Sequence, residues 1–555
     1  KTAYEIVDCD WSSDVCSSDL AADLRGGALR RILARAEDDV EEALATRGPR
    51  LRSAVPLHAC DSRTRRDLTA TLAAMPDTAS DRELIDAMRE RVASARATLR
   101  AALVAEQGEA AWGAALEALT ARGRFGIRLG LGRSRALLRA LESPEHGVRG
   151  ALVAGTNGKG SVVALVSAAL RAAGVRHATT TSPHLVSYRE RLQIDGRPIG
   201  ALQFARAIDR ALAAADRIEA RVGPTTEFEL LVGAIFEALR EEQVQTAVVE
   251  IGLGGRLDAM HAWDGGVAVI TNVGLDHERY LGDTIEAIAA EKAAIIVRGD
   301  RAVTGATLRG GALDVLRHRA ARVGAPLRVA IPGKVELLGR DGLEVELEGY
   351  GTVRIGLLGR HQSVNAAVAA ATIDALREAG IADVSPDALR SGFAAARWPG
   401  RMELIENAFG PASGRDLLLD GAHNPDGAVA LAGGIDDLGD GLRGAGKTTL
   451  VLGAMADKAV DALCVALAAS ERLRGATVVC TSVSDARSLS PADLERSAKA
   501  AGLGSSTIIA SDPAAAMRAA ATHHGPVVVA GSLYLVGAVR EGLMRSGVLP
   551  DDGLI

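Results

Sequence analysis

Residues 151–174 read ALVAGTNGKGSVVALVSAALRAAG, and this stretch decides the fold. A short apolar run typical of a buried strand leads into a glycine-rich loop, and a long apolar helix pattern follows. A strand, a tight loop and a helix N-terminus in this order form an arrangement that binds phosphate groups. The loop consists of Gly155, Thr156, Asn157, Gly158, Lys159, Gly160 and Ser161. The stretch therefore predicts a binding site for a nucleoside triphosphate.

The residue types in this loop suit that role. The glycines let backbone N–H groups come close to an anion. Lys159 can reach the terminal phosphates, and the hydroxyl of Ser161 can ligate Mg²⁺. The alternative is a glycine-rich turn that carries a lysine by chance.

A second segment matches the phosphate-loop pattern letter by letter. Residues 441–448 read GLRGAGKT, which fits G-x-x-x-x-G-K-[ST]. The segment before it, GGIDDLGD, is polar, and TTLVLGAM after it has the pattern of a strand rather than a helix. Because a phosphate site needs a helix N-terminus behind the loop, we interpret residues 441–448 as a surface turn.

Apolar strands and amphipathic helices alternate on both sides of the phosphate loop and far beyond it. The strand-like runs GALVAGT, QTAVVEIG and GVAVITNVG precede WPGR at residues 398–401, and DLLLDGAH, TTLVLGAM, GATVVCTS and PVVVAGS follow it. This alternation indicates an α/β fold with mostly parallel sheets covered by helices. We expect a phosphate-loop ATPase domain over residues 113–397 and a smaller Rossmann-like α/β domain over residues 398–555.

The first 112 residues carry no chemical motif. Residues 10–20 resemble the translation of a sequencing adapter, so residues 1–20 are expected to be an artefact, with a natural disordered N-terminus as the alternative. Residues 21–112 show helical spacing, for example in DRELIDAMRERVASARATLRAALVAEQ, and are expected to form a helical extension without an assigned function. A partner-binding role for these helices is compatible with the sequence.

The composition is that of an ordinary globular protein. The chain has 555 residues, of which 48% are hydrophobic and 24% charged, and its net charge of −6 argues against a nucleic-acid binder. It has no apolar run long enough to span a membrane and no signal-peptide pattern. Its 5 cysteines are too few and too scattered for a disulfide framework or a zinc site. We therefore expect a cytoplasmic protein that binds neither membranes nor nucleic acid.

Four polar residues are candidates for a site beside the phosphate loop. Glu250 ends one predicted strand, and Asp276 and His277 follow the next, at the edge where open α/β sheets bind ligands. A carboxylate and an imidazole beside phosphates suit Mg²⁺, although a salt bridge for Glu250 and a structural role for His277 stay open. Lys292 lies in an apolar helix pattern, in a chain whose 64 basic residues are nearly all arginine. A buried Lys292 would offer a nucleophilic amine, and the alternative is a lysine paired with Glu291.

Together these stretches resemble the Mur ligase superfamily, and within it the folylpolyglutamate synthase family, whose members are often also dihydrofolate synthases. The matching stretches, in the family's order, are RFGIRLGLGR (124–133), GTNGKGS (155–161), TSPHLVSYRERLQIDG (181–196), VVEIGLGGRLDA (248–259), ITNVGLDH (270–277), LGDTIEAIAAEKA (281–293), GRHQSVNA (359–366), WPGRME (398–403), LLLDGAHNPDG (417–427) and GSLYLVG (531–537). TSPHLVSYRER together with EIGLGGRLDA is specific to the folate branch. The segment ERYLGDT (278–284) departs from the family's usual pattern.

The resemblance implies an ATP-dependent amide ligase. A carboxylate of the pterin substrate would attack the γ-phosphate of ATP to give an acyl phosphate and ADP, and the amine of L-glutamate would then displace phosphate. Lys159 would contact the β- and γ-phosphates, and Ser161 and Glu250 would hold a first Mg²⁺. His277 would ligate a second Mg²⁺. Lys292 matches a lysine that CO₂ converts to a carbamate, which binds metal as a carboxylate.

The resemblance also implies contacts from elsewhere in the chain. Arg401 would reach the ATP phosphates across a domain cleft, Asp420 and His423 would contact the nucleotide, and Asn365 would lie beside the adenine. Ser182, His184 and Arg191 are expected on the pterin side, with a structural loop as the alternative. The expected partners are ATP, L-glutamate and dihydropteroate or a reduced folate, and a monomer is expected. K⁺ often aids the family's activity, but no residue here argues for it independently.

Two other functions stay open. Another Mur-type ligase, acting on a cell-wall nucleotide precursor, would need a UDP-binding N-terminal domain, and residues 21–112 show no βαβ pattern or glycine-rich loop for one. A non-catalytic nucleotide-binding protein on the same scaffold would lack the metal ligands, whereas all of them are present. The choice between dihydropteroate and reduced folate is not decided by the sequence.

Overall fold

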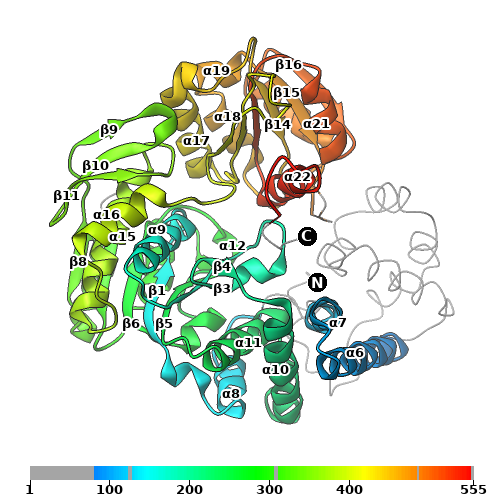
Figure 1. Cartoon of the computed structure of the whole chain (residues 1–555), viewed down its shortest axis with the longest axis vertical. Helices are drawn as coiled ribbons and strands as arrows, with labels where there is room; N and C mark the ends of the chain where they lie inside the picture. The colour runs from blue at the N-terminus through cyan, green and yellow to red at the C-terminus, as the bar shows by residue number, and fades with distance from the viewer. Residues whose placement is uncertain (1–80, 123–127, 306–309, 484, 486, 552–555) are drawn as a thin grey trace. The chain divides into compact units, whose positions relative to one another are not determined.

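The computed structural model describes residues 81–122, 128–305, 310–483, 485 and 487–551 (Figure 1). The adapter-like residues 1–20, the helical pattern before residue 81 and part of the stretch 124–133 lie outside the described residues. The chain forms two compact units. Of the described residues, the first unit comprises 81–122, 128, 201–234, 485 and 487, and the second comprises 129–200, 235–305, 310–483 and 488–551.

The described part of the first unit is helical, and of the extension predicted over residues 21–112 it includes only the segment from residue 81 on. Its helices are α6 (Asp81–Val104), α7 (Gly108–Thr120), α10 (Ala201–Val222) and the start of α11 (Glu227–Glu241). Apolar residues recur every three or four positions in α10, which gives it one buried face. Trp112 of α7 stacks on Phe204 of that face, with ring centroids 5.5 Å apart. Residues 201–234 thus belong with the N-terminal helices, although the sequence analysis places them in the ATPase domain.

The larger unit is built on an eight-stranded sheet of order β4-β3-β2-β5-β1-β6-β7-β8. Its strands are β1 (Arg149–Ala154), β2 (Ala178–Thr180), β3 (Gln193–Ile194), β4 (Arg197–Pro198), β5 (Thr246–Glu250), β6 (Gly266–Ile270), β7 (Arg301–Gly305) and β8 (Leu327–Ala330). The pairs from β2 to β8 are parallel, and β3 and β4 add an antiparallel edge. All residues of β5 are buried, as expected for a valine-rich central strand.

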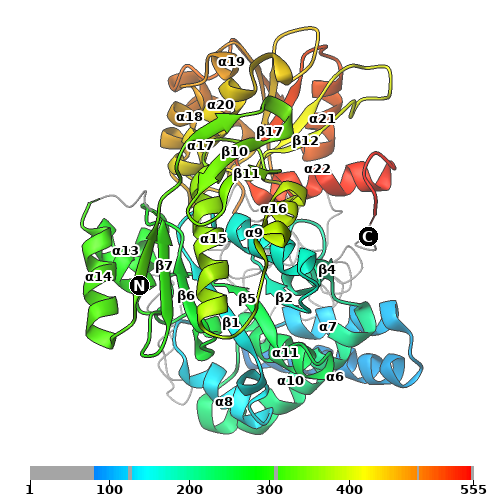
Figure 2. The ribbon, with the colours of Figure 1, turned by 60° about the vertical axis from the view of Figure 1, so that its left-hand side comes forward.

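Helices cover this sheet on both faces. They are α8 (Gly132–Ala140), α9 (Lys159–Ala172), α12 (Glu278–Leu281), α13 (Ile285–Ala293), α14 (Ala312–Val323), α15 (Gln362–Glu378) and α16 (Pro386–Ala395). Figure 2 shows α9 and α15 side by side against the sheet, and both contribute to one apolar core. A small antiparallel sheet, which the sequence analysis did not predict, packs on the same core; its strands are β9 (Val335–Leu337), β10 (Leu343–Leu347) and β11 (Gly351–Ile355).

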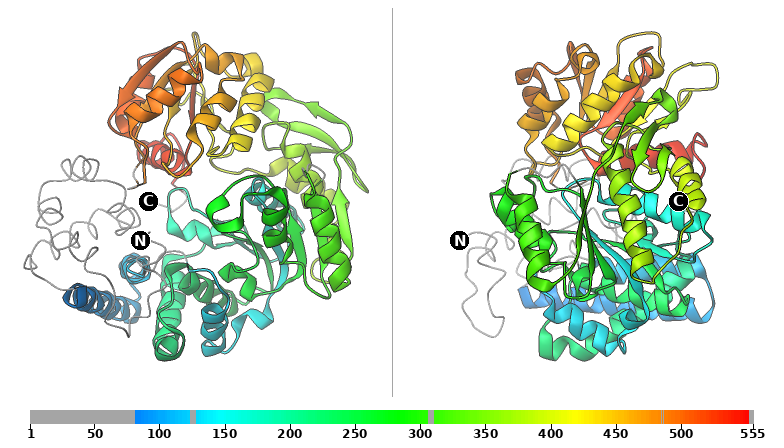
Figure 3. Two further views of the ribbon diagram at one scale, coloured as in Figure 1. Left: turned by 180° about the vertical axis from the view of Figure 1, so that it is seen from behind. Right: turned by 90° about the vertical axis from the view of Figure 1, so that its left-hand side faces the viewer.

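The C-terminal part of this unit has a six-stranded sheet of order β12-β13-β17-β14-β15-β16. Its strands are β12 (Glu403–Ile405), β13 (Leu417–Leu419), β14 (Thr449–Leu452), β15 (Thr477–Thr481), β16 (Ser506–Ala510) and β17 (Val527–Ala530). Only β12 is antiparallel to its neighbour. Its helices are α17 (Pro425–Leu438), α18 (Val460–Leu467), α19 (Glu471–Arg474), α20 (Pro491–Ala500), α21 (Pro513–Ala521) and α22 (Leu533–Arg545). They cover both faces of the sheet (Figure 3), and each face carries one apolar core, which confirms the predicted α/β fold class.

The strand order fixes where a ligand can bind. β1 lies between β5 and β6. From β1 the chain goes to β2, on the β5 side, and later it passes from β5 to β6, on the opposite side of β1. Such a switch in direction opens a crevice at the carboxyl ends of the strands, here the loops after β1, β5 and β6. Within the described part of the chain, no helix is long and apolar enough to cross a membrane.

Candidate active site

The phosphate loop joins β1 to α9, as the sequence predicts. Gly158 precedes the first turn of α9 with a φ of 82°, and a Cβ atom there would overlap the side-chain oxygen of Asn365. Glycine is thus required at Gly158 by both conformation and space. No side chain caps the start of α9, so its first N–H groups point to the loop without a side-chain acceptor.

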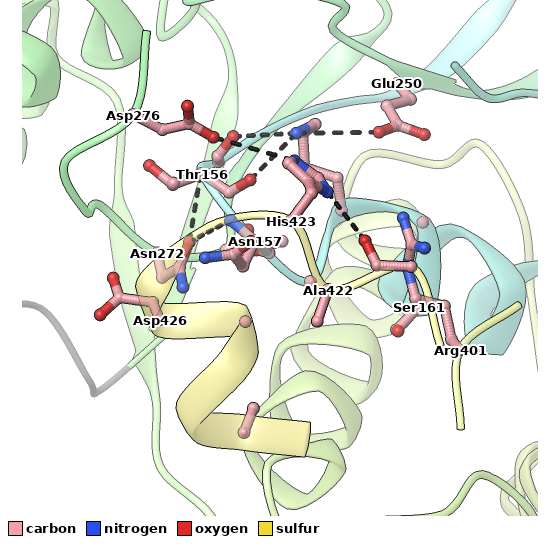
Figure 4. Close-up of a pocket in the computed structure, with 18 of the residues that line it drawn as sticks. Thr156, Asn157, Ser161, Glu250, Asn272, Asp276, Arg401, Ala422, His423 and Asp426 are labelled. Atoms are coloured by element: carbon pink, nitrogen blue, oxygen red, sulfur yellow. Dashed lines mark hydrogen bonds and ion pairs between the residues drawn. The ribbon is translucent and has the colours of Figure 1, made fainter. Parts of the chain in front are cut away.

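Asn272, in the loop after β6, holds the phosphate loop in shape. Its Oδ1 accepts hydrogen bonds from the backbone N–H groups of Thr156 at 3.1 Å and Asn157 at 2.8 Å (Figure 4). The Thr271 hydroxyl donates to the carbonyl oxygen of Asn157 at 2.6 Å. Asn272 was not predicted from the sequence, because a single asparagine after a strand forms no pattern.

Lys159 connects the loop to the carboxylate at the end of β5. Its Nζ donates to the carbonyl oxygens of Gly155 at 3.1 Å and Thr156 at 3.3 Å, and lies 3.8 Å from Oε1 of Glu250. Burial raises the pKa of Glu250, and the nearby charge of Lys159 and a hydrogen bond from the N–H of Ser182 act against that rise. Glu250 is thus a buried carboxyl group, and a nearby cation is needed to stabilise its ionised form.

Asp258 is a second buried carboxyl group beside the loop that the sequence analysis did not single out. It accepts backbone hydrogen bonds from Leu253 at 2.8 Å and Met260 at 2.9 Å, which shape the turn after β5. Burial raises its pKa to about 6, with these hydrogen bonds opposing the rise.

Ser161, in the first turn of α9, is linked to α15. Gln362 Nε2 donates to the Ser161 hydroxyl oxygen at 3.3 Å, and Asn365 Nδ2 donates to Oε1 of Gln362 at 2.8 Å. The Ser161 oxygen keeps a second lone pair for another partner. The predicted nucleotide residue Asn365 is therefore tied to the predicted metal ligand Ser161 through Gln362, which the sequence analysis missed.

Asp276 lies at the centre of a polar network that joins the loop after β6 to the C-terminal part of the larger unit. It accepts hydrogen bonds from Lys458 Nζ at 2.8 Å and from Asn424 Nδ2 at 3.0 Å. Asn424 also donates to the Asn157 side chain at 3.1 Å. Burial alone would raise the pKa of Asp276, but the charges of His277 and Lys458 and these hydrogen bonds hold it well below its usual range.

The sequence carried signals for both partners of Asp276. Lys458 is one of few lysines in an arginine-rich chain. Asn424 stands directly before Pro425 at a helix start, where asparagine is a favoured N-cap. Its Oδ1 does accept the N–H of Gly427 at 2.8 Å.

His277 and Lys292 lie at the same end of the cavity. The His277 side chain is 42% exposed, and burial of the ring lowers its pKa, which favours the neutral form. Lys292 is only 3% exposed, and burial together with the charge of Lys159 lowers its pKa to about 7. Much of Lys292 is then a free amine at neutral pH.

The side chains of the cavity suit a Mg²⁺ ion that substrate phosphates also bind. Within the described residues, no group of three or more His, Cys, Asp or Glu side chains could hold a metal ion. Mg²⁺ prefers oxygen ligands and is commonly held by one or two carboxylates together with substrate phosphates. The Glu250 carboxylate and the Ser161 hydroxyl meet that description beside a phosphate loop.

Three predicted nucleotide residues come from the C-terminal side of the cavity. The Asp420 carboxylate accepts the N–H groups of Met402 and Ala422, both at 2.8 Å, and burial raises its pKa. His423 Nδ1 lies 2.8 Å from the carbonyl oxygen of Gly421, and burial lowers its pKa to about 4. Arg401 donates to the carbonyl oxygen of Gly400 at 3.2 Å. Figure 4 shows Arg401 and His423 facing the same space as Ser161.

The cavity has a volume of about 410 Å³ and is lined by nearly all the predicted site residues. They are Gly155, Thr156, Asn157, Gly158, Lys159, Gly160, Ser161, Ser182, Glu250, His277, Lys292, Asn365, Arg401, Asp420 and His423. Such a volume is typical of small-molecule sites.

Two predicted site residues, His184 and Arg191, do not line the cavity. Arg191 Nε donates to His184 Nδ1 at 2.9 Å, and its guanidinium lies 4.4 Å from the centre of the Tyr188 ring. Burial lowers the pKa of His184 to about 3. The contacts hold the loop 182–191 together, and Pro183 of this loop lines both the main cavity and a neighbouring one of about 380 Å³.

The segment that matches the phosphate-loop pattern letter by letter has a structural role. Residues 441–448 run directly into β14, with no helix behind them, as we interpreted. Arg443 of this segment donates to the buried carboxylate of Asp416 at 3.1 Å.

Comparisons with known proteins identify the domains from which this cavity is built. Residues 153–304 match the Mur ligase middle domain, and residues 400–533 match the Mur ligase glutamate ligase domain. Over 321 residues, 56% of this chain and 72% of the relative, the chain is 37% identical to dihydrofolate synthase/folylpolyglutamate synthase of Bacillus subtilis.

Two solved structures resemble the chain as well. Folylpolyglutamate synthase of Mycobacterium tuberculosis, complexed with ADP and AMPPCP, aligns with a TM-score of 0.67 at 32% identity, covering 75% of this chain and 96% of that one. FolC of E. coli, in complex with DHPP and ADP, aligns with a TM-score of 0.65 at 27% identity, covering 76% and 94%. The chain is therefore an ATP-dependent ligase and belongs to the folylpolyglutamate synthase/dihydrofolate synthase family of Mur ligases.

Proposed function

We propose that this ligase joins the amino group of L-glutamate to a carboxylate of dihydropteroate or a reduced folate. The observation that carries the proposal is the convergence of a phosphate loop, a buried carboxylate and a buried amine in one cavity, which is also lined by Arg401 from the turn before β12. The relatives support the substrate class, because their names specify folate ligases and one structure contains DHPP with ADP.

The reaction has two steps, a phosphoryl transfer and the formation of the amide. A substrate carboxylate oxygen bonds to the γ-phosphorus as the bond to ADP breaks, and the glutamate nitrogen then bonds to the carbonyl carbon as phosphate leaves and the amine loses a proton. The first step needs positive charge and alignment at the phosphates. Lys159 and Arg401 supply charge from opposite sides, and the N–H groups at the start of α9 bind the phosphates.

Ser161 and Glu250 would hold a first Mg²⁺. When bound, the ion supplies positive charge that stabilises the transferring phosphoryl group. Because burial disfavours the ionised form of Glu250, a cation beside it restores that form and makes the pair a suitable site.

His277 and Lys292 would serve a second Mg²⁺, provided that Lys292 is carbamylated. An ammonium group cannot ligate a metal, whereas a carbamate offers two oxygens. Carbamylation joins the neutral amine to CO₂ and releases a proton, so the lowered pKa of Lys292 favours it. The pKa supports this assignment together with the burial of the side chain among the cavity residues.

The C-terminal residues complete the nucleotide site. Asp420 and His423 would contact the nucleotide, and Asn365 would lie beside the adenine, on α15. Ser182 is proposed on the pterin side, because it lines the cavity and its N–H bonds to Glu250. His184 and Arg191 would act on that side by holding the loop. We further propose a cytoplasmic monomer whose activity responds to K⁺.

Glutamate-dependent release of phosphate from ATP and Mg²⁺ tests the proposal, with dihydropteroate and tetrahydrofolate in separate reactions. Turnover with dihydropteroate establishes a dihydrofolate synthase, and turnover with tetrahydrofolate a folylpolyglutamate synthase. Protein that binds ATP but is silent with both contradicts the folate substrate and favours another Mur-type ligase. The Ser161→Ala variant should lose turnover, and Ser391→Ala, at an exposed serine outside the cavity, should keep it.

A further inference from the structure

The start of α15 and the first turns of α17 bring aliphatic side chains and the imidazole of His361 to the wall of the cavity. The aliphatic residues are Val364 of α15 and Val429 and Ala430 of α17, and the same turns of α17 also contribute Asp426. Val429 is 57% exposed although it is aliphatic. Aliphatic side chains suit the faces of a nucleobase, and a few placed polar groups fix its identity.

His361 is the polar group in question. Its backbone is helical, with φ −62° and ψ −20°, so it lies one turn before Asn365 on the same face of α15. Its Nδ1 is buried and has no hydrogen-bond partner among the described residues. Gly359 closes that edge of the ring: a Cβ atom at Gly359 would lie 2.7 Å from Cε1 and 2.9 Å from Nδ1 of His361.

The protonation of His361 follows from its surroundings. Burial lowers its pKa to about 4, and of the charges that face it, Asp437 raises the pKa while Arg401 lowers it. The ring is therefore neutral at pH 7 and carries one proton. A proton on Nδ1 would leave a buried N–H without an acceptor, which is rarer in proteins than an acceptor without a donor. The favoured tautomer carries its proton on Nε2, and His361 is one of the residues that line the cavity.

We propose that His361 determines the nucleotide base, and that its Nε2–H donates a hydrogen bond to an acceptor ring nitrogen of adenine. The inference rests on ATP as the nucleotide of the proposed reaction. A donor at this position suits N1, N3 or N7 of adenine. Guanine carries a proton on N1, so a contact at N1 would also exclude GTP.

Calorimetric binding of Mg-ATP and of its 1-deaza, 3-deaza and 7-deaza analogues tests this without folate or glutamate. The proteins are the wild type, His361→Phe, His361→Gln and the control His146→Phe, at a side chain 79% exposed. Loss of one neutral hydrogen bond should weaken ATP binding about 3- to 10-fold in His361→Phe. His361→Gln places an amide N–H near the Nε2 position and should retain most of the affinity.

The analogues decide the outcome. In the wild type one deaza analogue should bind about 3- to 10-fold more weakly than ATP, and His361→Phe should bind that analogue and ATP equally. If His361→Phe lowers the affinity of ATP and all three analogues by the same factor, or leaves ATP binding unchanged, the proposal is wrong. Should His361→Phe not fold, His361→Asn gives the same test, since its amide reaches the Nδ1 position only. Wild-type protein that binds no ATP would instead contradict the nucleotide site itself.

Discussion

Replacing Gly158 by alanine probes the phosphate loop at the point where it contacts α15. The residue has a φ of 82°, and a Cβ atom would overlap Oδ1 of Asn365. The variant must therefore adopt an unfavourable backbone conformation and also displace Asn365. Gly174→Ala is a matched control, because Gly174 has a φ of 69° and no heavy atom lies within 4 Å of its Cβ position.

The two variants should differ by a predictable amount. An L-residue in the left-handed region costs about 1–2 kcal/mol, and this is the whole expected loss for Gly174→Ala. Displacing Asn365 also breaks its 2.8 Å hydrogen bond to Gln362, which contributes about 1 kcal/mol. The free energy of unfolding should thus fall by about 2–3 kcal/mol in Gly158→Ala.

Urea unfolding and calorimetric titration with AMPPCP measure both effects. Gly158→Ala should bind the nucleotide at least about tenfold more weakly, since a loss of 1.4 kcal/mol is tenfold, while Gly174→Ala should bind like the wild type. Asn365→Ala in the Gly158→Ala background should recover part of the stability, because the overlapping oxygen is gone. Equal losses in Gly158→Ala and Gly174→Ala, with normal binding in both, would refute the reasoning.

The site supports four more predictions. Lys159→Met should weaken ATP binding at least about tenfold, whereas Lys447→Met, in the segment that only matches the pattern, should leave it unchanged by calorimetry. Asp276→Asn and Lys458→Met should show a coupling of about 1–3 kcal/mol in a double-mutant cycle of unfolding free energy; additive losses would contradict the ion pair. The pKa of Asp276 is lower in the folded than in the unfolded protein, so the ionised carboxylate stabilises the fold at pH values above the unfolded pKa. This stabilisation is lost as the pH falls through the folded pKa. Asp276→Asn should therefore flatten the acid limb of a profile of unfolding free energy against pH. Lys292→Ala should abolish turnover yet keep ATP binding, and retained turnover would remove the carbamate from the account.

The sequence predicted the parts of this molecule that local patterns specify. The phosphate loop was found because strand, glycines and apolar helix stand next to one another in the chain. For the same reason the match at residues 441–448 could be set aside, since the strand after it is visible in the sequence. Lys292 and Glu250 were found through the resemblance and through their places in apolar segments.

Contacts between distant segments were not predictable in this way. Asn272 holds the phosphate loop although it lies 115 residues after Asn157 in the chain, and Lys458 lies 182 residues after its partner Asp276. The small sheet β9–β11 was also missed, because its strands are short and alternate polar with apolar residues around glycine turns. His184 and Arg191 were predicted from a motif that is specific to the family, but they do not line the cavity. A family motif alone therefore does not show which of its side chains reach the site.

Transfer of ¹⁸O from the substrate carboxylate to phosphate tests the central claim most directly. Dihydropteroate, or tetrahydrofolate if that is the substrate used, would carry ¹⁸O in the carboxylate that accepts glutamate. An acyl phosphate intermediate predicts that each phosphate released contains one of these oxygens, because the carbon–oxygen bond breaks when the glutamate nitrogen attacks. Unlabelled phosphate from reactions that form the amide product would contradict carboxylate activation by ATP in this site.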